Sequence, residues 1–354
     1  MKLRQRGLHL NFLQHGPFTS GSPRASLLLL LNILIFHARI FSQEDSLNLR
    51  QQTIAQDTTE VSDFQVRSPT TKQKRNRTLL IGGVNLAGYG GSLVLLNRTW
   101  YKDFPRTSFH TFNDGREWLQ MDKIGHSWAA YNAGMVTAAM WKWAGVEKRK
   151  AAIIGGASST AYLTAVELMD AYSEKWGWSW SDIVANVAGS GLFVGQELLW
   201  GEQRIQFKFS FHHKEYGEPV LDERADELFG KTWYERMLKD YNAQTHWLSI
   251  NIISFLSQSE FPQWLNVAVG YGADGLYGGF ENVWNTGDTG FPIDRSDIPR
   301  KRQFYLSPDI DFTKIRTNKK WLRTVFTFLN AFKCPAPALM LDSKGKVRFY
   351  GLYF

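Results

Sequence analysis

The sequence has a single cysteine, Cys334, among its 354 residues. One cysteine excludes an intrachain disulfide and a zinc site built from several cysteines. Because no cysteine lies near the N-terminus, we also expect no lipid-modified N-terminal cysteine. The chain is likewise without a basic patch interleaved with aromatic residues of the kind that binds nucleic acid. We therefore expect no nucleic-acid partner.

Acidic residues are missing from the first 42 positions, which carry five Lys or Arg residues. An apolar stretch follows Arg24 and is too short to span a bilayer comfortably, but it has the length of the central region of a signal peptide. We therefore expect residues 1–42 to be a signal peptide cleaved near Ser42 or, alternatively, a retained membrane anchor. Residues 43–77 are polar with few apolar side chains, and they predict a disordered linker.

Charge is also absent from residues 78–97, a run of 20 residues. Its length and composition fit a membrane-spanning helix. Its glycines would weaken a water-exposed helix but allow close helix packing in lipid. A cluster typical of a membrane interface follows directly, and it consists of Arg98, Trp100, Tyr101 and Lys102.

Three shorter uncharged runs follow, at 127–141, 151–166 and 183–196. Each is shorter than the roughly 20 residues needed to cross a bilayer, so flanking polar residues would have to enter the membrane edge. The competing interpretation is a set of buried helices in a soluble bundle. Gly191 and Gly195 form a G-x-x-x-G pattern, which predicts helix packing.

The pattern changes after Gly201. Three segments have the alternation or aromatic content of strands, namely 205–211, 309–315 and 346–354. Residues 240–258 instead predict an amphipathic helix. The predicted fold class is mainly α: a small membrane bundle of about four helices over residues 78–204, followed by a mixed α/β extension with short strands over residues 205–354.

Charged groups gather at the ends of the uncharged runs. The segment "QMDKIGHSWAAY" places Asp122, Lys123 and His126 at the start of the first run. Asp122 and His126 are four residues apart, so they share a helix face. Glu167 and Asp170 share a face in the same way at the end of the next run.

The segment "SWSDIVANVAGSG" places Ser179 three residues before Asp182, as at the capped start of a helix. Successive helices of an up-and-down bundle alternate in direction. The start of the first helix, the end of the second and the start of the third therefore lie on the same side. We predict that His126, Glu167 and Asp182 converge there, with polar atoms within about 8 Å.

Two interpretations of this cluster remain open. The candidate acid–base or metal residues are His126, Glu167, Asp170 and Asp182, with Asp122, Lys123, Tyr131, Ser181 and Asn186 in support. Ionisable groups in membrane helices are costly and usually functional, and carboxylates with an imidazole suit a hard divalent ion. No cofactor is predicted, and a divalent metal is left open. In the alternative, Asp122 and Asp182 only favour helix N-termini and Lys123 reaches to the membrane interface.

The order D-K-x-x-H, an acid at the end of a small-residue-rich helix, and S-D-x-x-A-N-x-x-G resembles the VanZ-like membrane proteins. The closer resemblance, over about residues 78–354, is to the YfiM-like family, a bacterial domain family of unknown function described as predicted periplasmic lipoproteins. It extends to "DYNAQTHWLS" and "LNVAVGYGADG". The resemblance implies an envelope location and a small helical membrane core, and no established reaction. The missing lipobox cysteine departs from the lipoprotein pattern and favours attachment by the chain's own helices.

We therefore expect a bacterial cell-envelope protein that is exported or membrane-embedded, in either the inner or the outer membrane. The leading hypothesis is a structural or interaction role with membrane lipid as the partner and with unknown protein partners. The alternative is an intramembrane enzyme acting on a lipid or lipid-linked headgroup. In that enzyme His126 would be the base, and Glu167, Asp170 and Asp182 would be metal ligands or proton partners.

Overall fold

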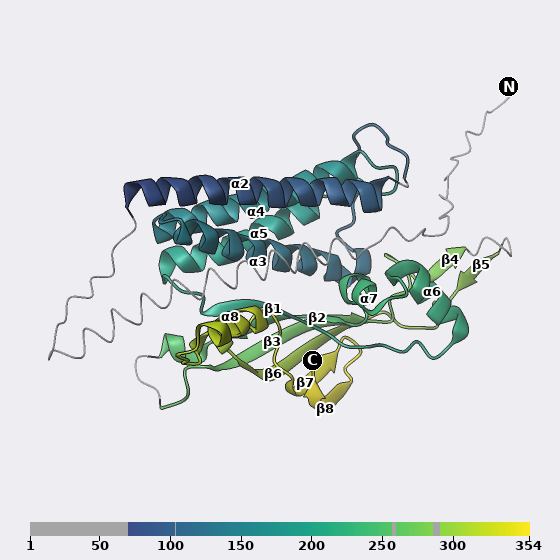
Figure 1. The fold of residues 1–354 in the computed structure, drawn as a ribbon. Coiled ribbons are helices and arrows are strands. Elements are labelled where there is room, and N and C mark those ends of the chain that lie inside the picture. The colour runs from purple at the N-terminus through teal and green to yellow at the C-terminus, as the bar shows by residue number, and fades with distance from the viewer. Residues whose placement is uncertain (1–69, 103, 257–259, 286–290) are drawn as a thin grey trace, which may run out of the picture.

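The structure is a computed structural model, and it describes residues 70–354 apart from 103, 257–259 and 286–290. The predicted signal peptide or anchor at 1–42 and residues 43–69 of the predicted linker at 43–77 lie outside these residues. The described chain forms a layer of long helices beside a six-stranded antiparallel sheet, with helices and strands running in roughly the same direction (Figure 1).

Four long helices lie side by side in the upper part of Figure 1. They are α2 (Thr71–Leu96), α3 (Met121–Trp143), α4 (Lys148–Ala171) and α5 (Trp180–Leu199). α2 begins earlier than the run at 78–97 because Thr70 caps it and accepts a hydrogen bond from the backbone N–H of Gln73. The predicted cap of α5 is confirmed, since Ser179 Oγ accepts from Asp182 N at 3.0 Å.

Glycines set how closely α3, α4 and α5 approach one another. A Cβ added to Gly189 of α5 would lie 2.0 Å from the backbone oxygen of Ser127 in α3, and one added to Gly155 of α4 would lie 2.3 Å from the α3 backbone. A larger residue at either position would force the helices apart. Gly191 and Gly195 have no atom within 4 Å of an added Cβ, so the helix-packing prediction for this pair is wrong among the described residues.

Six strands form the sheet in the order β1-β2-β3-β6-β7-β8. They are β1 (Ile205–Phe211), β2 (Gln244–Ile250), β3 (Leu265–Asp274), β6 (Lys301–Ile310), β7 (Ala336–Asp342) and β8 (Val347–Tyr353). The shorter strands and helices are β4 (Val283–Asn285), β5 (Pro292–Asp294), α6 (Pro219–Phe229), α7 (Trp233–Lys239) and α8 (Lys320–Leu329). Single turns complete the described elements: η1 (Asn97–Tyr101), η2 (Glu117–Gln120), η3 (Ile252–Phe255) and η4 (Phe312–Lys314).

One face of the sheet is buried and contains polar as well as aromatic side chains. Lys208 Nζ lies 2.9 Å from Asp309 Oδ2, and both side chains are fully buried. The rings of Trp247 and Tyr353 pack with centroids 6.0 Å apart. The hydroxyl of Tyr353 in β8 lies 2.9 Å from Thr245 Oγ1 in β2, so the sheet curls around this interior.

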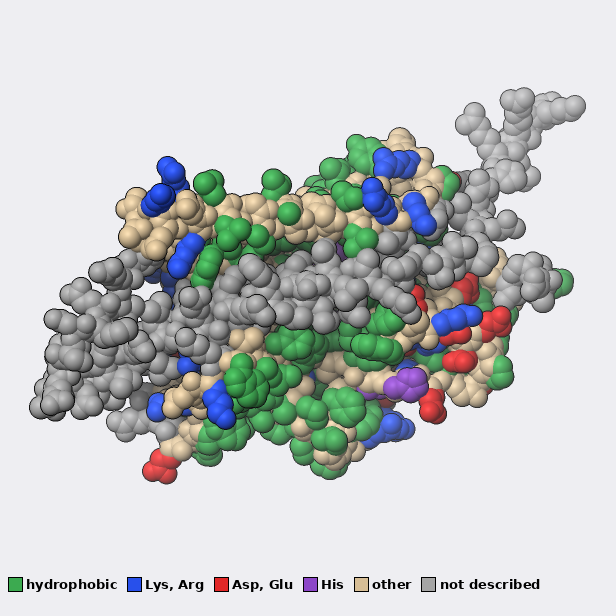
Figure 2. All heavy atoms as spheres, viewed as in Figure 1, with side chains coloured by type: hydrophobic (Ala, Val, Ile, Leu, Met, Phe, Trp, Pro, Cys, Tyr) green, Lys and Arg blue, Asp and Glu red, His purple; other side chains and the backbone are tan. Residues whose placement is uncertain are grey.

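Apolar side chains occupy the other face. Leu248, Val269, Leu306, Leu339 and Phe349 hold paired positions on five successive strands. They are 39–69% exposed, and Figure 2 shows apolar side chains gathered over the sheet half of the molecule. At β1 this face packs against the helical layer, because Phe207, which pairs with Leu248, is buried against Tyr131 of α3. From β2 to β8 the five side chains leave an exposed apolar surface.

The predicted fold class, a mainly α membrane bundle with a small mixed extension, is wrong. The described residues contain the large sheet, and α2 alone among their helices has the length and hydropathy to cross a membrane. The sheet was missed because its buried face carries Lys208, Ser249 and Asp309 while its exposed face is apolar, which reverses the usual alternation. The division into regions 78–204 and 205–354 stays a prediction.

Two of the three predicted strands are present, as β1 and β8. At 309–315 the chain instead leaves β6 after Ile310 and forms η4. Residues 240–258, predicted as an amphipathic helix, contain β2 and η3. The helical prediction failed because the spacing of apolar residues there fits both the period of a helix and the period of a strand. Residues 244–250 form a strand because they pair with β1 and β3.

α2 lies on the outer side of the helical layer (Figure 1). Ile81 is its only buried residue. Four other large apolar side chains point outward, and these are Leu79, Leu80, Leu86 and Val94, which are 52–78% exposed. Only 6% of its most apolar stretch is buried inside the protein. By length and composition α2 meets the requirement for a membrane span.

Candidate functional site

His126 lies where α3, α4 and α5 meet at one end of the helical layer. Its Nε2 is 3.8 Å from Asp122 Oδ1 on its own helix and 3.9 Å from Asp182 Oδ1 on α5. Its Nδ1 is 3.7 Å from Glu167 Oε1 on α4 and 3.2 Å from Asn186 Oδ1 on α5. The structure therefore brings these five residues together, while a catalytic role for them stays a prediction.

Lys123 is buried between three carboxylates. Its Nζ lies 2.5 Å from Asp114 Oδ2, 2.8 Å from Asp122 Oδ2 and 2.7 Å from Asp182 Oδ1. One interpretation of the sequence was that Lys123 reaches to a membrane interface. The structure instead buries its side chain, which is only 10% exposed. It acts instead as the internal cation that joins the loop before η2 to α3 and α5.

Two residues of the cluster, Asp114 and Tyr241, were not found from the sequence. Asp114 Oδ1 accepts hydrogen bonds from the hydroxyls of Ser179 and Ser181, each at 2.6 Å. Tyr241 follows α7 and donates its hydroxyl to Asp122 Oδ1 at 3.0 Å. Asp114 stands in an Asn-Asp-Gly turn signal, but such a signal predicts a loop and not the partner that the loop reaches.

Two predicted residues lie apart from the imidazole. Asp170 Oδ1 accepts a hydrogen bond of 2.7 Å from the hydroxyl of Tyr101, at the end of η1. Tyr131 donates its hydroxyl to Gln203 Oε1 at 3.1 Å, toward the start of β1. Because Tyr131 follows His126 by five residues, it is rotated by about 140° around the helix and faces the sheet.

Glu167 and His126 both hold protons more firmly than usual. Burial raises the pKa of Glu167 to about 8, and the charge of Asp182 adds to this while His126 opposes it. For His126, burial alone would lower the pKa, but the carboxylates of Asp122, Asp182 and Glu167 raise it above its ordinary value. Near neutral pH the Glu167 carboxyl is therefore protonated, beside an imidazole that is readily protonated.

Two of the three carboxylates around Lys123 behave in the opposite way. Burial would raise the pKa of Asp114, but hydrogen bonds from Lys123 and from two serines outweigh it and lower the pKa to about 2. Burial also opposes ionisation of Asp122, yet the charges of His126 and Lys123 lower its pKa. The third carboxylate, Asp182, has its pKa raised to about 6 by burial and by the charge of Asp122. The site thus contains carboxyl groups with lowered and with raised pKa values, as acid–base centres do.

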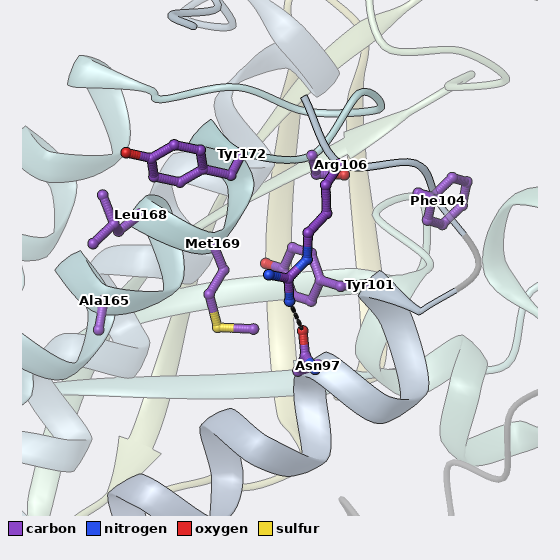
Figure 3. A pocket seen from close by; sticks show the side chains of 9 residues that line it. Asn97, Tyr101, Phe104, Arg106, Ala165, Leu168, Met169 and Tyr172 are labelled. Carbon is purple, nitrogen blue, oxygen red and sulfur yellow. Dashed lines mark hydrogen bonds between the residues drawn. The ribbon is translucent and has the colours of Figure 1, made fainter. Parts of the chain in front are cut away.

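A pocket of about 250 Å³ lies at the junction of η1 and the end of α4 (Figure 3). Tyr101 lines this pocket and also binds Asp170, so it connects the pocket to the acidic end of α4. Arg106 donates to Asn97 Oδ1 at 3.1 Å at its edge. The other lining residues are mostly apolar: Phe104, Ala165, Leu168, Met169, Tyr172 and Ser173.

Residues 111–195 match a family model described as "Predicted periplasmic lipoprotein (DUF2279)". No curated protein and no solved structure gives a significant match to the chain. The matched segment contains α3, α4, most of α5 and every charged residue around His126. The match supports a periplasmic family of unknown function and a location in the cell envelope. The YfiM-like and VanZ-like resemblances stay predictions.

Proposed function

We propose that the protein works at a membrane of the bacterial cell envelope, in a structural or interaction role with membrane lipid as its partner, and that α2 attaches it there. The observation that carries this proposal is the surface of α2, on which the apolar side chains of Leu79, Leu80, Leu86 and Val94 are 52–78% exposed. A helix at a protein–water boundary normally hides its apolar residues in a stripe against the core. The match to a periplasmic family supports the envelope location.

The sheet supports the same proposal from a second direction. Its outward row from Leu248 to Phe349 is apolar across five strands. Soluble monomers rarely expose contiguous apolar patches of large extent, and such patches usually mark a membrane or protein partner. The molecule therefore offers lipid two apolar surfaces, one on α2 and one on the sheet.

Introducing charge into α2 tests the proposal. We expect the wild-type protein to sediment with membranes and to resist carbonate extraction. Leu86→Glu combined with Val94→Glu should release most of it, because a charged side chain within a membrane helix costs about 3 kcal/mol. The intact mass of the mature protein shows whether residues 1–42 have been removed. If they have, residues 1–42 cannot account for the membrane attachment, and the test reports on α2.

The matched control is Leu86→Ala with Val94→Ala, which shortens the same exposed side chains without adding charge and should stay in the membrane fraction. Recovery of the wild-type protein as a monodisperse soluble species without detergent would contradict the proposal.

A second candidate function, an enzyme acting on a lipid or lipid-linked headgroup, has the support of one observation. The pocket beside α4 combines apolar walls with Arg106 and connects through Tyr101 to Asp170, which lies about one helical turn beyond Glu167 on α4. This arrangement suits a substrate with an acyl chain and an anionic headgroup. Incubation of the purified protein with envelope lipid extract should then release a headgroup detectable by mass spectrometry. His126→Asn should stop the release, and equal turnover by that variant would rule this candidate out.

A further inference from the structure

Asp122, His126 and Asp182 face one another as metal ligands do. Each offers one ligand atom, and these atoms all lie within 4.8 Å of one another. His126 Nε2 is 3.8 Å from Asp122 Oδ1 and 3.9 Å from Asp182 Oδ1. A cation centred between three atoms at such separations would lie about 2.2 to 2.5 Å from each, which is near or slightly above the bond lengths of Zn²⁺ with nitrogen and oxygen.

The imidazole has the orientation of a metal-binding histidine. Its Nδ1 lies 3.2 Å from Asn186 Oδ1, and Asn186 is completely buried. When Nδ1–H donates to this oxygen, the lone pair of Nε2 points at the two aspartates. Histidines that bind metals almost always donate their other N–H to a fixed acceptor in this way, which sets the tautomer and the ring angle.

One oxygen of the proposed site is buried without a hydrogen-bond partner, which independently indicates a missing ligand. Asp182 is 4% exposed, and its Oδ1 accepts no hydrogen bond although Lys123 Nζ lies 2.7 Å away. Buried polar groups are rarely left unsatisfied in folded proteins. A cation bound between Asp122, His126 and Asp182 would give this oxygen a ligand bond.

Carboxyl groups outnumber cationic side chains around the site. Those of Asp114, Asp122 and Asp182 all face the single ammonium of Lys123. Uncompensated buried charge is costly, so an excess of carboxyl groups favours a bound cation.

Lys123 does not occupy the whole site. It contacts Asp122 through Oδ2, whereas Oδ1 faces His126 and accepts one hydrogen bond, from the hydroxyl of Tyr241. Lys123 shares only Asp182 Oδ1 with the proposed cation. The side chains of Asp122 and His126 are 24% and 21% exposed, so an ion can enter from solvent and keep water on its open side.

We propose that Asp122, His126 and Asp182 bind one divalent transition-metal ion, with Zn²⁺ as the preferred ion. One imidazole and two carboxylates form a nitrogen and oxygen ligand set that Zn²⁺ accepts readily, and three protein ligands with one open position are typical of reactive zinc sites. The proposal is independent of the membrane attachment by α2 and of any lipid substrate.

Direct binding measurements test the proposal. The full-length protein, purified in detergent without a polyhistidine tag and stripped with a chelator, is titrated with ZnCl₂ by calorimetry. We expect one saturable site per chain, a higher melting temperature in excess Zn²⁺, and release of protons on binding because the imidazole must be neutral. Co²⁺ should give the visible absorption of a low-symmetry site.

His126→Asn should weaken Zn²⁺ binding at least about 100-fold and abolish the Co²⁺ absorption, and Asp182→Asn should weaken binding by a similar factor. The matched control is His213→Asn, which removes an exposed histidine and should leave affinity unchanged. Circular dichroism of the metal-free variants shows whether each one is folded. If His126→Asn does not fold, Asp182→Asn provides the test. Absence of a saturable site in the wild type, or unchanged binding in the folded variants, would overturn the proposal.

Discussion

Lys123→Met should lower the free energy of unfolding by about 3–5 kcal/mol, because removing one partner of a buried ion pair leaves its counter-charge without compensation. Here the loss falls on three carboxylates at once, since Asp114, Asp122 and Asp182 all lie within 2.8 Å of Lys123 Nζ. Methionine keeps most of the length of the side chain, so the packing of α3 against α5 changes little. Chemical denaturation of the protein in detergent, followed by tryptophan fluorescence, measures the change.

Lys150→Met is the matched control for this substitution. Lys150 belongs to α4, but its side chain is 73% exposed and its ion pair with Glu147 spans 3.5 Å. Exposed pairs contribute about 0–1 kcal/mol, so the control should leave stability nearly unchanged. The penalty of Lys123→Met should shrink in acid, where the carboxylates take up protons. An equal effect of the two substitutions at neutral pH would show that Lys123 is not the internal counter-ion.

The meeting of His126, Glu167 and Asp182 follows from the sequence because it depends only on helix direction and on spacing within helices. Each residue lies within the first two or last two turns of an element whose periodicity is visible, and three consecutive helices must alternate in direction. Asp114 and Tyr241 could not be found in this way. They reach the cluster from a loop and from a segment 119 residues beyond Asp122, and no local pattern encodes a contact over that distance.

The sheet shows the opposite limit of sequence reasoning. Its strands carry a clear alternation, but polar residues such as Lys208 and Asp309 occupy the buried positions and pair with one another there. Alternation predicts that a segment is a strand, but it does not show which of the two faces is buried. Polar residues can occupy the buried face because their hydrogen-bond partners lie on strands far away in the sequence. The apolar positions from Leu248 to Phe349 were therefore not recognised as an outward surface.

Glu167→Gln should remove a large part of the pH dependence of stability. The pKa of Glu167 is raised by burial from 4.5 to about 8, so the folded state holds a proton that the unfolded state releases. The contribution of Glu167 to the free energy of unfolding is fully present below about pH 4.5. It is lost as the pH rises toward about 8, because the carboxyl group ionises in the unfolded state while it stays protonated in the folded state. A tenfold difference in proton affinity between the folded and unfolded states corresponds to about 1.4 kcal/mol, so the loss amounts to a few kcal/mol and stays below about 5 kcal/mol.

Glutamine has the shape of the protonated carboxyl and cannot ionise, so the variant keeps the neutral form at every pH. We expect the two proteins to be equally stable near pH 4.5 and the variant to be more stable by a few kcal/mol near pH 8. His126 contributes a slope of the same sign in both, since its raised pKa stabilises the fold when the ring is protonated and this is lost on deprotonation. The difference between the two stability curves therefore isolates Glu167.

Glu174→Gln is the matched control, because Glu174 is exposed just beyond α4 and its substitution should leave the curve unchanged. Melting temperatures from about pH 4.5 to about pH 8.5 provide the measurement. A variant that parallels the wild type across this range would show that Glu167 is ionised in the folded protein. The buried carboxyl would then be a permanent negative charge beside His126, and the cluster would carry one more charge for a bound cation to neutralise.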